Sequence, residues 1–182
     1  MPAYRETFTG KESAFFEIRS IMPEDAVEFC KFLDLVSRET HFTNEFPEQP
    51  KEPARMAQGM KKTLEIPNLF WAGAFIGPEM VGFLAMRCMT SDGHPFFSHV
   101  YTFDLMILKK AWGKGLGNRL MEVLDEQALK RGAKRIEALV KEGNDRAQAL
   151  YKKHGYEIEG TRRKAVCLGG KYIDEYYVAK LF

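Results

Sequence analysis

The sequence predicts an α+β domain, built on a mixed central β-sheet of about seven strands with helices on both faces. Short segments of alternating or continuous apolar residues predict the strands, and segments with apolar residues every third or fourth position predict the helices. Along the chain the order is strand, two helices, three strands, helix, strand, helix and two strands. A chain of 182 residues is long enough for one domain with a substantial core and short for two.

The N-terminal third is expected to contain one strand and two helices. Residues 1–13 are polar and mixed, and we expect an N-terminal extension that is poorly ordered or packs late. Residues 15–22 alternate as a strand does, and Pro23 then suits the first turn of a helix. Residues 37–50 lose the period and are expected to form a long loop, of the kind that often carries function. Residues 51–64 return to helical composition.

The middle of the chain is expected to form a hairpin and a long strand. Residues 69–76 and 80–89 are apolar runs separated by Gly-Pro-Glu, which is typical of a turn. A second loop covers residues 90–97, and residues 98–108 form a strand that leads into a glycine-rich segment. Three strands therefore follow one another in the chain before the third helix begins.

The C-terminal part is expected to contain a short strand, a short helix and a final hairpin. Residues 135–140 form the strand, and Asn144 is a good N-cap for the helix that Gly155 ends. Residues 156–163 and 172–181 are two strands with a Gly-Gly turn between them, which is typical of a hairpin. That hairpin is suited to pair across a homodimer.

The glycine-rich segment at residues 103–119, FDLMILKKAWGKGLGNR, is the most informative stretch of the chain. Gly113, Gly115 and Gly117 alternate, and a helix with leucines at every fourth position begins at once. The first turn of a helix has unpaired backbone N–H groups that favour an anion, and glycines let a phosphate approach closely. Lys114 and Arg119 add positive charge. The residues predict a phosphate or pyrophosphate site at 113–118.

The spacing of the glycines limits which ligand carries the phosphates. No Gly-Lys-Ser/Thr closes the run, which excludes a Walker loop. A dinucleotide fingerprint needs glycines at positions one, three and six, whereas here they fall at one, three and five. Glu137 lies roughly 20 residues on, where that fingerprint has an acid, but it is in mid-strand. A nucleotide-binding oxidoreductase is therefore disfavoured, and a turn that only packs a helix on the sheet is the other alternative.

Two motifs in this order resemble those of the GNAT acyltransferases. WGKGLG at residues 112–117 is similar to the family's acetyl-CoA pyrophosphate motif, with Trp112 where the family has Arg or Gln. NDRAQALYKKHGYEIEGTRRK at residues 144–164 is similar to its second motif, with an Asn, an Ala three residues on, Leu-Tyr, a basic residue and Gly-aromatic. The resemblance covers about residue 16 to the C-terminus. It implies a single N-acetyltransferase domain at residues 14–182.

The resemblance also implies how the cofactor is held. In that fold the fourth and fifth strands splay apart, and the cofactor lies between them like an extra strand. The implied contacts to acetyl-CoA are Leu105, Met106, Ile107, Gly113, Lys114, Gly115, Leu116, Gly117, Asn118, Asn144 and Tyr151, with no metal. Trp112, next to the glycines, could pack over the cofactor or anchor the loop to the core, and we favour the anchor. An oxyanion donor would come from a backbone N–H near Met106 or Ile107.

The implied reaction moves an acetyl group from acetyl-CoA to a primary amine of a small molecule, peptide or protein by direct attack. Tyr151 falls on the tyrosine of the Leu-Tyr motif and is the candidate general acid, since a phenol with a pKa of about 10 is protonated at neutral pH. Some family members carry a glutamate where this chain has Leu139. Asp104, a carboxylate in an apolar strand, is therefore a candidate base. The other candidates are Glu39, His41, Glu45, His94, His99 and water.

The acceptor pocket is expected between residues 39–48 and residues 172–177. These segments contain the aromatic residues Phe42, Phe46, Tyr172 and Tyr176 and the acids Glu39, Glu45, Asp174 and Glu175. Acids would attract a cationic amine, and aromatic rings could stack on it. A non-catalytic acyl-CoA-binding sensor is the alternative function, which Leu139 favours and Tyr151 opposes.

Composition adds limits of its own. The net charge of +2 is spread along the chain and gives no reason to propose a nucleic-acid partner. Three widely spaced cysteines show neither metal-ligand spacing nor a disulfide framework, which favours a reducing cytoplasm. No apolar run approaches a membrane span, and the N-terminus has no signal-peptide pattern.

Overall fold

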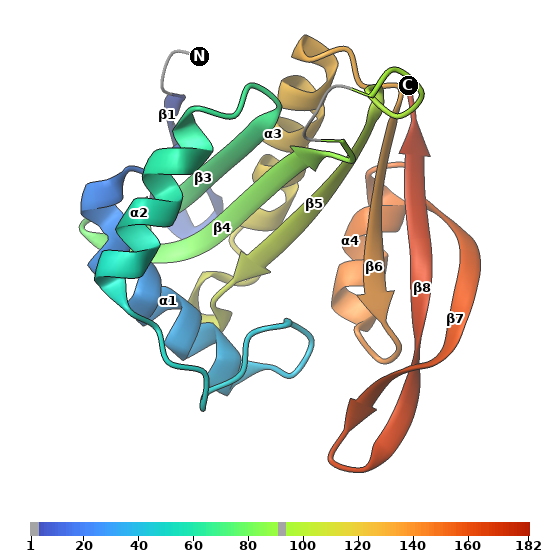
Figure 1. The fold of residues 1–182 in the computed structure, drawn as a ribbon. Coiled ribbons are helices and arrows are strands. Elements are labelled where there is room, and N and C mark those ends of the chain that lie inside the picture. The colour runs from blue at the N-terminus through green and yellow to red at the C-terminus, as the bar shows by residue number, and fades with distance from the viewer. Residues whose placement is uncertain (1–3, 91–93) are drawn as a thin grey trace.

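A computed structural model describes residues 4–90 and 94–182 as one mixed sheet with helices on both faces (Figure 1). The strands are β1 (Arg5–Thr9), β2 (Phe15–Ser20), β3 (Leu69–Ile76), β4 (Glu79–Cys88), β5 (Val100–Ile107), β6 (Arg135–Lys141), β7 (Glu157–Leu168) and β8 (Lys171–Leu181). The helices are α1 (Ala26–Glu39), α2 (Pro53–Leu64), α3 (Leu116–Lys130) and α4 (Asp145–Lys153), with short 3₁₀ turns η1 (Lys11–Ser13), η2 (Pro23–Asp25) and η3 (Lys109–Ala111). The fold class is confirmed. Expectations for residues 1–3 and 91–93 lie outside the described residues.

The sheet has eight strands in the order β1-β2-β3-β4-β5-β6-β8-β7, one more than the seven expected. The additional strand is β1, which pairs antiparallel with β2 and brings Thr7 opposite Glu17. The expected poor order is therefore wrong for this segment. Its physical reason is that Tyr4 and Phe8 pack against the core, while Glu6 between them pairs with Arg119 of α3.

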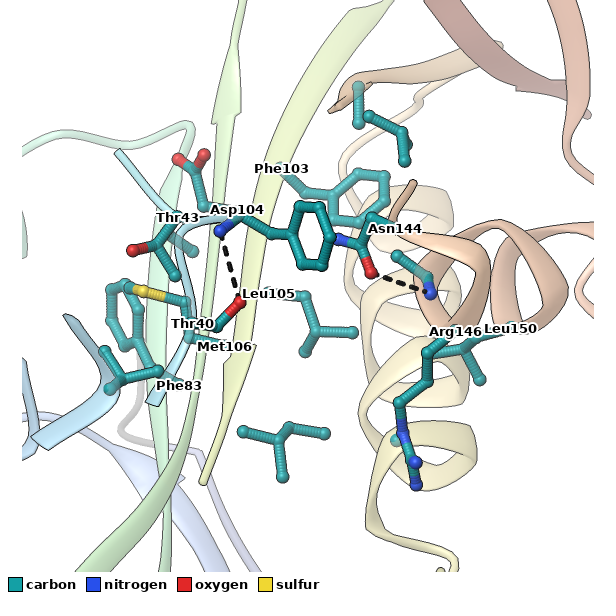
Figure 2. A pocket seen from close by; sticks show the side chains of 18 of the residues that line it. Thr40, Thr43, Phe83, Phe103, Asp104, Leu105, Met106, Asn144, Arg146 and Leu150 are labelled. Carbon is teal, nitrogen blue, oxygen red and sulfur yellow. Dashed lines mark hydrogen bonds between the residues drawn. The ribbon is translucent and has the colours of Figure 1, made fainter. Parts of the chain in front are cut away.

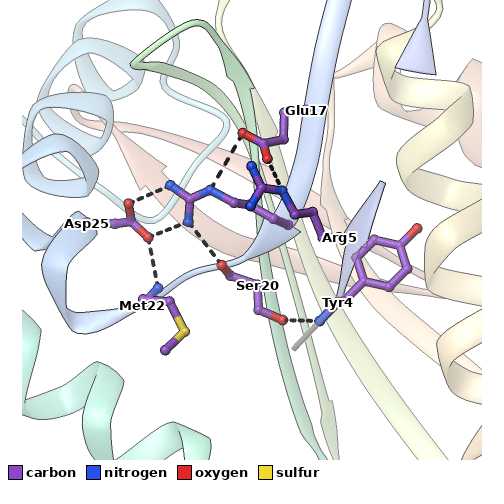
Figure 3. A network of polar contacts seen from close by, with 7 residues as sticks. Tyr4, Arg5, Glu17, Ser20, Met22 and Asp25 are labelled. Carbon is purple, nitrogen blue, oxygen red and sulfur yellow. Dashed lines mark hydrogen bonds and ion pairs between the residues drawn. The ribbon is translucent and has the colours of Figure 1, made fainter. Parts of the chain in front are cut away.

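Polar contacts hold this N-terminal edge in place (Figure 3). Tyr4 donates its backbone N–H to the Ser20 hydroxyl over 3.0 Å, and Arg5 forms an ion pair with Glu17. Arg19 of β2 holds Asp25 through two hydrogen bonds of 2.7 Å. Because Asp25 also accepts the Met22 N–H at 2.9 Å, the network fixes the entry into α1.

Each face of the sheet has its own apolar core. On one face α3 buries Leu116, Leu120 and Leu124 completely against the strands. On the other face α1 buries Phe29, Phe32, Leu33 and Val36, and Met60 of α2 joins them. The apolar residues whose spacing predicted these helices are therefore the ones that pack on the sheet.

The sheet opens between β5 and β6. Within the described chain these parallel strands share three residue pairs, residues 100–102 with residues 135–137. Beyond them β5 continues beside β4 as far as Ile107, and β6 continues beside β8 as far as Lys141. The sheet is thus a V whose arms are β1–β5 and β6–β8 (Figure 1). In the part of the chain that the structure describes, residues 103–107 of β5 have no strand partner on the side of β6.

Candidate active site

The open end of the V holds a cleft of about 1740 Å³. Its walls come from β5, the glycine loop, the start of α4, the segment after α1 and the neighbouring faces of β3 and β4. Figure 2 shows Phe103, Asp104 and Leu105 of β5 on one side and Asn144, Arg146 and Leu150 on the other. The structure therefore brings both sequence motifs to one cavity.

The backbone of β5 presents alternate residues to this cleft. Leu108 donates its N–H to the Val81 oxygen over 3.0 Å, which fixes the phase of the ladder with β4. In an antiparallel ladder, alternate residues direct both backbone groups to the same partner. Met106 is therefore directed toward β4, and Leu105 and Ile107 toward the open edge. The expectation of a Met106 backbone contact does not fit this phase, although its side chain lines the cleft.

The glycine loop adopts a conformation that requires glycine. Gly113 has φ of 75° and Gly115, the N-cap of α3, has φ of 90°, in the left-handed region. At Gly117 an added Cβ would lie 3.3 Å from Leu150 of α4. These glycines line the cleft together with Leu116 and Asn118, at the first turn of α3, where the N–H groups lack intrahelical partners. The loop thus both packs the helix and faces the cleft.

The charges around the loop differ from those expected. Arg119 donates to Glu6 at 2.6 and 2.8 Å and also pairs with Glu122 and Glu126, so its charge is already compensated. Lys114 does not line the main cleft; it lines a smaller hollow of about 440 Å³ beside the loop.

Arg146, which sequence reasoning missed, supplies a cation inside the cleft. Its guanidinium lies 4.2 Å from the centre of the Trp112 ring, and Trp112 donates its indole N–H to the Ile107 oxygen over 2.8 Å. The expected anchoring role of Trp112 is confirmed. Arg146 lies two residues after Asn144, at the start of the second motif, and this place in the motif could have indicated it.

Asn144 and Tyr151 place α4 against the cleft. Asn144 caps the helix, because its side-chain oxygen accepts the Ala147 N–H at 3.3 Å, and it also lines the cleft. Asn118 binds the far end of α4 by accepting from Lys153 at 2.7 Å. The expected cap is confirmed.

Tyr151 is buried and lies edge-on to Phe103, with ring centres 5.2 Å apart. Burial raises the pKa of the Tyr151 phenol far above its usual value, and the negative charge of Asp104 adds to the effect. The phenol is therefore protonated throughout the pH range in which proteins are stable. It lines the cleft on the α3–α4 side of β5.

Asp104 lines the cleft from the opposite face of β5. It is half exposed and forms an ion pair with Arg87 of β4 over 2.7 Å. The carboxylate thus has the partner that a charge in an apolar strand requires. Leu139, half exposed, occupies the facing arm where some relatives were expected to carry a glutamate.

The other candidate bases divide into two groups. Glu39, His41 and Glu45 line the cleft, and Glu39 already accepts the backbone N–H of Lys109 at 2.7 Å. His94 and His99 precede the closed, paired start of β5, and neither is among the described residues that line the cleft.

The acceptor pocket draws on fewer residues than expected. Phe42, Glu175 and Tyr177 line the cleft. Phe46 and Tyr172 are 53% and 62% exposed and fall outside the described lining, as do Tyr176 and Asp174. Alternation along β8 explains the difference, since Glu175 and Tyr177 share one face and residues 174 and 176 share the other.

Lys141, at the end of β6, was not anticipated. It is buried to 7% exposure and donates to the backbone oxygens of Thr43 at 2.6 Å and His41 at 3.4 Å. Burial lowers the pKa of its ammonium, an effect that the nearby Glu175 carboxylate opposes. Lys141 therefore fixes the segment after α1 across the mouth of the cleft.

Comparison with known proteins gives one consistent family. The family model described as "Acetyltransferase (GNAT) family" matches residues 33–156. The L-amino acid N-acetyltransferase AaaT of Escherichia coli (strain K12) is 33% identical over 111 residues, which are 59% of this chain and 65% of that protein. This chain therefore matches just under two thirds of that relative's length.

Solved structures agree in fold. An acetyltransferase of the GNAT family from Streptococcus pneumoniae superposes with a TM-score of 0.84 at 30% identity, covering 92% of this chain and 99% of that one. A phosphinothricin acetyltransferase from Sinorhizobium meliloti, solved in complex with acetyl-CoA, has a TM-score of 0.79 at 16% identity and covers 96% and 89%. In the part of this chain that the structure describes, no helix is long and apolar enough to cross a membrane.

These matches confirm the expected resemblance to the GNAT acetyltransferases. They cover both motifs as far as residue 156, including Tyr151 and the glycine loop. The chain belongs to the acetyltransferase (GNAT) family.

Proposed function

We propose that this protein transfers the acetyl group of acetyl-CoA to the primary amine of a small molecule by direct attack. The observation that carries the proposal is the V-shaped opening of the sheet, where the unpaired edge of β5 meets both the glycine loop and Tyr151. The name of the AaaT relative supports an amino acid as acceptor over a peptide or protein.

The cofactor would extend along β5 toward α3. The pyrophosphate would lie on the backbone N–H groups of residues 115–118, with Arg146 adding positive charge. The pantetheine amides would pair with the open edge at Leu105 and Ile107. Asn144 would contribute its side chain beside this path. The acetyl thioester would then reach the part of the cleft between Tyr151 and Asp104.

The chemical step needs one donor for the oxyanion and one proton for the leaving group. The neutral amine attacks the thioester carbonyl carbon, and the charge on its oxygen would be stabilised by the unpaired N–H of Leu105 or Ile107. When the carbon–sulfur bond breaks, the sulfur carries away the electron pair and Tyr151 donates the phenolic hydrogen. Burial raises the pKa of Tyr151, and it would also raise that of a thiol formed in the same pocket.

The attacking nitrogen must lose a proton as the amide forms. Asp104 is the carboxylate on the acceptor side of β5, where it would bind the ammonium form and accept the proton directly or through water. Tyr151 then regains a proton from solvent. The products are CoA and the N-acetylated acceptor.

Calorimetry and a thiol-release assay test the proposal. Wild-type protein should bind acetyl-CoA, and an amine panel should release CoA in proportion to product. Binding without turnover of any amine would favour the acyl-CoA sensor, to which Leu139 in place of a glutamate points. Absence of acetyl-CoA binding would overturn both functions.

We further propose that the protein is cytoplasmic and forms a homodimer. Cys30, Cys88 and Cys167 are free thiols, which is what a reducing cytoplasm predicts. Pairing through the β7–β8 hairpin, which forms the edge of the sheet, would give a homodimer. Sedimentation of the protein would decide the second point.

A further inference from the structure

We infer that the β1–β2 hairpin sets the phosphate-binding conformation of the glycine loop at residues 113–117, with Gly10 and Lys11 as positioning residues. This inference rests on the proposed function and adds to it a part of the chain outside both sequence motifs. The hairpin also precedes residues 33–156, which the family model matches. The evidence is a row of contacts that ends in one backbone hydrogen bond to the loop.

Alternate residues of the hairpin lie along the start of α3 and the loop before it. Glu6 accepts a hydrogen bond of 2.6 Å from the arginine of α3. Two residues on, Phe8 lies beside Gly115, where an added Cβ would be 3.5 Å from its ring. Two residues further, an added Cβ at Gly10 would overlap the Lys114 carbonyl oxygen. Because residues two apart share a face of a strand, one face of the hairpin follows the chain from α3 back into the loop.

The hairpin gives up one of its own hydrogen bonds to reach the loop. The two central residues of the turn between Lys11 and Ala14 have φ of 57° and 58°, as in a type I′ turn. The residues that flank such a turn usually exchange two hydrogen bonds. Ala14 donates to the Lys11 oxygen at 3.2 Å, but its own oxygen accepts from Gly10 at 2.7 Å. The Lys11 N–H instead donates to the Lys114 oxygen over 2.9 Å.

This bond determines where the next N–H of the loop points. In a planar trans peptide, the C=O of one residue and the N–H of the next point in opposite directions. Because Lys11 holds the Lys114 oxygen, the Gly115 N–H is turned away from the hairpin. Gly115 lines the cleft, and within the described chain no hydrogen bond occupies its N–H. The phosphates of acetyl-CoA would therefore meet a donor at this position.

The glycines make such a restraint necessary. Gly113 and Gly115 lack a Cβ, so the peptides between them can rotate at little steric cost. A rotated peptide between Lys114 and Gly115 would direct a carbonyl oxygen at the phosphates and repel them. By holding the other orientation before the ligand arrives, the hairpin would raise the affinity for acetyl-CoA.

Two substitutions at Lys11 separate its backbone donor from its side chain. The side chain lines the cleft, and both Lys11→Ala and Lys11→Pro remove it, whereas only Lys11→Pro removes the N–H. Lys11 has a negative φ, and Gly10 before it is extended, at φ −83° and ψ −170°, so position 11 accepts proline. Calorimetry should give a Kd for acetyl-CoA at least about tenfold higher for Lys11→Pro than for Lys11→Ala, as expected when a donor to a charged group is misplaced.

Steady-state kinetics show whether the effect is confined to the phosphates. With the amine that the wild type acetylates best, the KM for acetyl-CoA should be higher in Lys11→Pro than in Lys11→Ala, while kcat differs less than about twofold. The two variants should use S-acetylpantetheine, which has no phosphate, equally well. A hairpin that only stabilised the fold would lower the melting temperature and the use of both acetyl donors together.

Gly10→Ala provides a second, independent variant, because its Cβ would displace the Lys114 oxygen. The matched control is Gly73→Ala in β3, whose Cβ would overlap Phe75 and Met80, and residue 73 is not part of the described cleft lining. Both variants should lower the melting temperature, but only Gly10→Ala should raise the Kd for acetyl-CoA.

The outcomes separate this inference from the proposed function. Equal Kd values for Lys11→Pro and Lys11→Ala, or for Gly10→Ala and Gly73→Ala, would overturn the inference and leave the acetyltransferase proposal standing. An equal loss with S-acetylpantetheine and acetyl-CoA would do the same. Absence of acetyl-CoA binding by the wild type would overturn both.

Discussion

The Lys141 ammonium donates to the Thr43 backbone oxygen over 2.6 Å and thereby joins two parts of the chain 98 residues apart. Lys141 ends β6, on one arm of the V. On the other arm, Glu39 accepts the N–H of Lys109, just beyond β5, at 2.7 Å. The segment from Glu39 to Thr43 is thus fastened to both arms and spans the open end of the cleft.

Replacing Lys141 with Met should release that segment on one side. The Thr43 oxygen would lose its charged donor, and a hydrogen bond to a charged group contributes about 1.5–3 kcal/mol to the free energy of unfolding. The KM for the acceptor should rise, while the Kd for acetyl-CoA changes little. Denaturant unfolding and acceptor saturation kinetics measure the two effects. Lys180→Met, which removes a 2.6 Å ion pair with Asp125 outside the described cleft lining, should leave the acceptor KM unchanged.

Tyr151→Phe should reduce kcat about 100-fold or more, because the leaving thiolate would lose its proton donor. The Kd for acetyl-CoA should change little, since the ring still packs on Phe103. Tyr156→Phe is the control: Tyr156 is equally buried and also contacts Phe103, at 5.6 Å, but is not part of the described cleft lining. Equal rates for Tyr151→Phe and wild type would remove Tyr151 from the mechanism.

Gly115→Glu should abolish acetyl-CoA binding measured by calorimetry. The substitution places a carboxylate where the pyrophosphate is proposed to lie. It also strains a residue at φ of 90°, so the control must carry a comparable strain. Gly132→Glu provides it, with φ of 77° and no described atom within 4 Å of an added Cβ. Retained binding by Gly115→Glu would contradict the phosphate site.

Acid should weaken the attachment of β1 to α3. Burial alone would raise the pKa of Glu6, but hydrogen bonds and charge from Arg119 outweigh it and hold the pKa below its usual 4.5. The stabilisation is therefore complete above about pH 4.5 and is lost as pH falls from there through the lowered folded-state pKa.

Glu6→Gln should cost on the order of 1 kcal/mol of the free energy of unfolding at neutral pH, and progressively less as the pH falls below about 4. Urea titrations of both proteins at several pH values measure the difference. Glu122→Gln removes a carboxylate from the same arginine, but it is 53% exposed and should have a smaller effect. A cost for Glu6→Gln that is the same at every pH would contradict this assignment.

The sequence predicted the helices and the inner strands because their signals are local. The leucine repeat of α3 and the Asn144 cap depend on neighbours within a few residues, and both are present in the structure. The glycine loop could be predicted for the same reason, because the positive φ angles at Gly113 and Gly115 favour glycine at those positions.

Features that depend on contacts between residues far apart in the sequence could not be predicted. β1 was missed because its strand character comes from Tyr4 and Phe8 meeting a core assembled from later residues. Arg119 was assigned to the phosphate site because its partner Glu6 lies 113 positions away.

Because the sheet opens between β5 and β6, a ligand bound in this opening would add to the stability of the fold. Three residue pairs are all that the described β5–β6 ladder supplies, and a ligand that bonds to the free edge of β5 adds links between the arms. Ligand at one hundred times its Kd contributes about 2.7 kcal/mol to the free energy of unfolding. In a cell, the fraction of this chain exposed to proteases would then fall as the concentration of such a ligand rises.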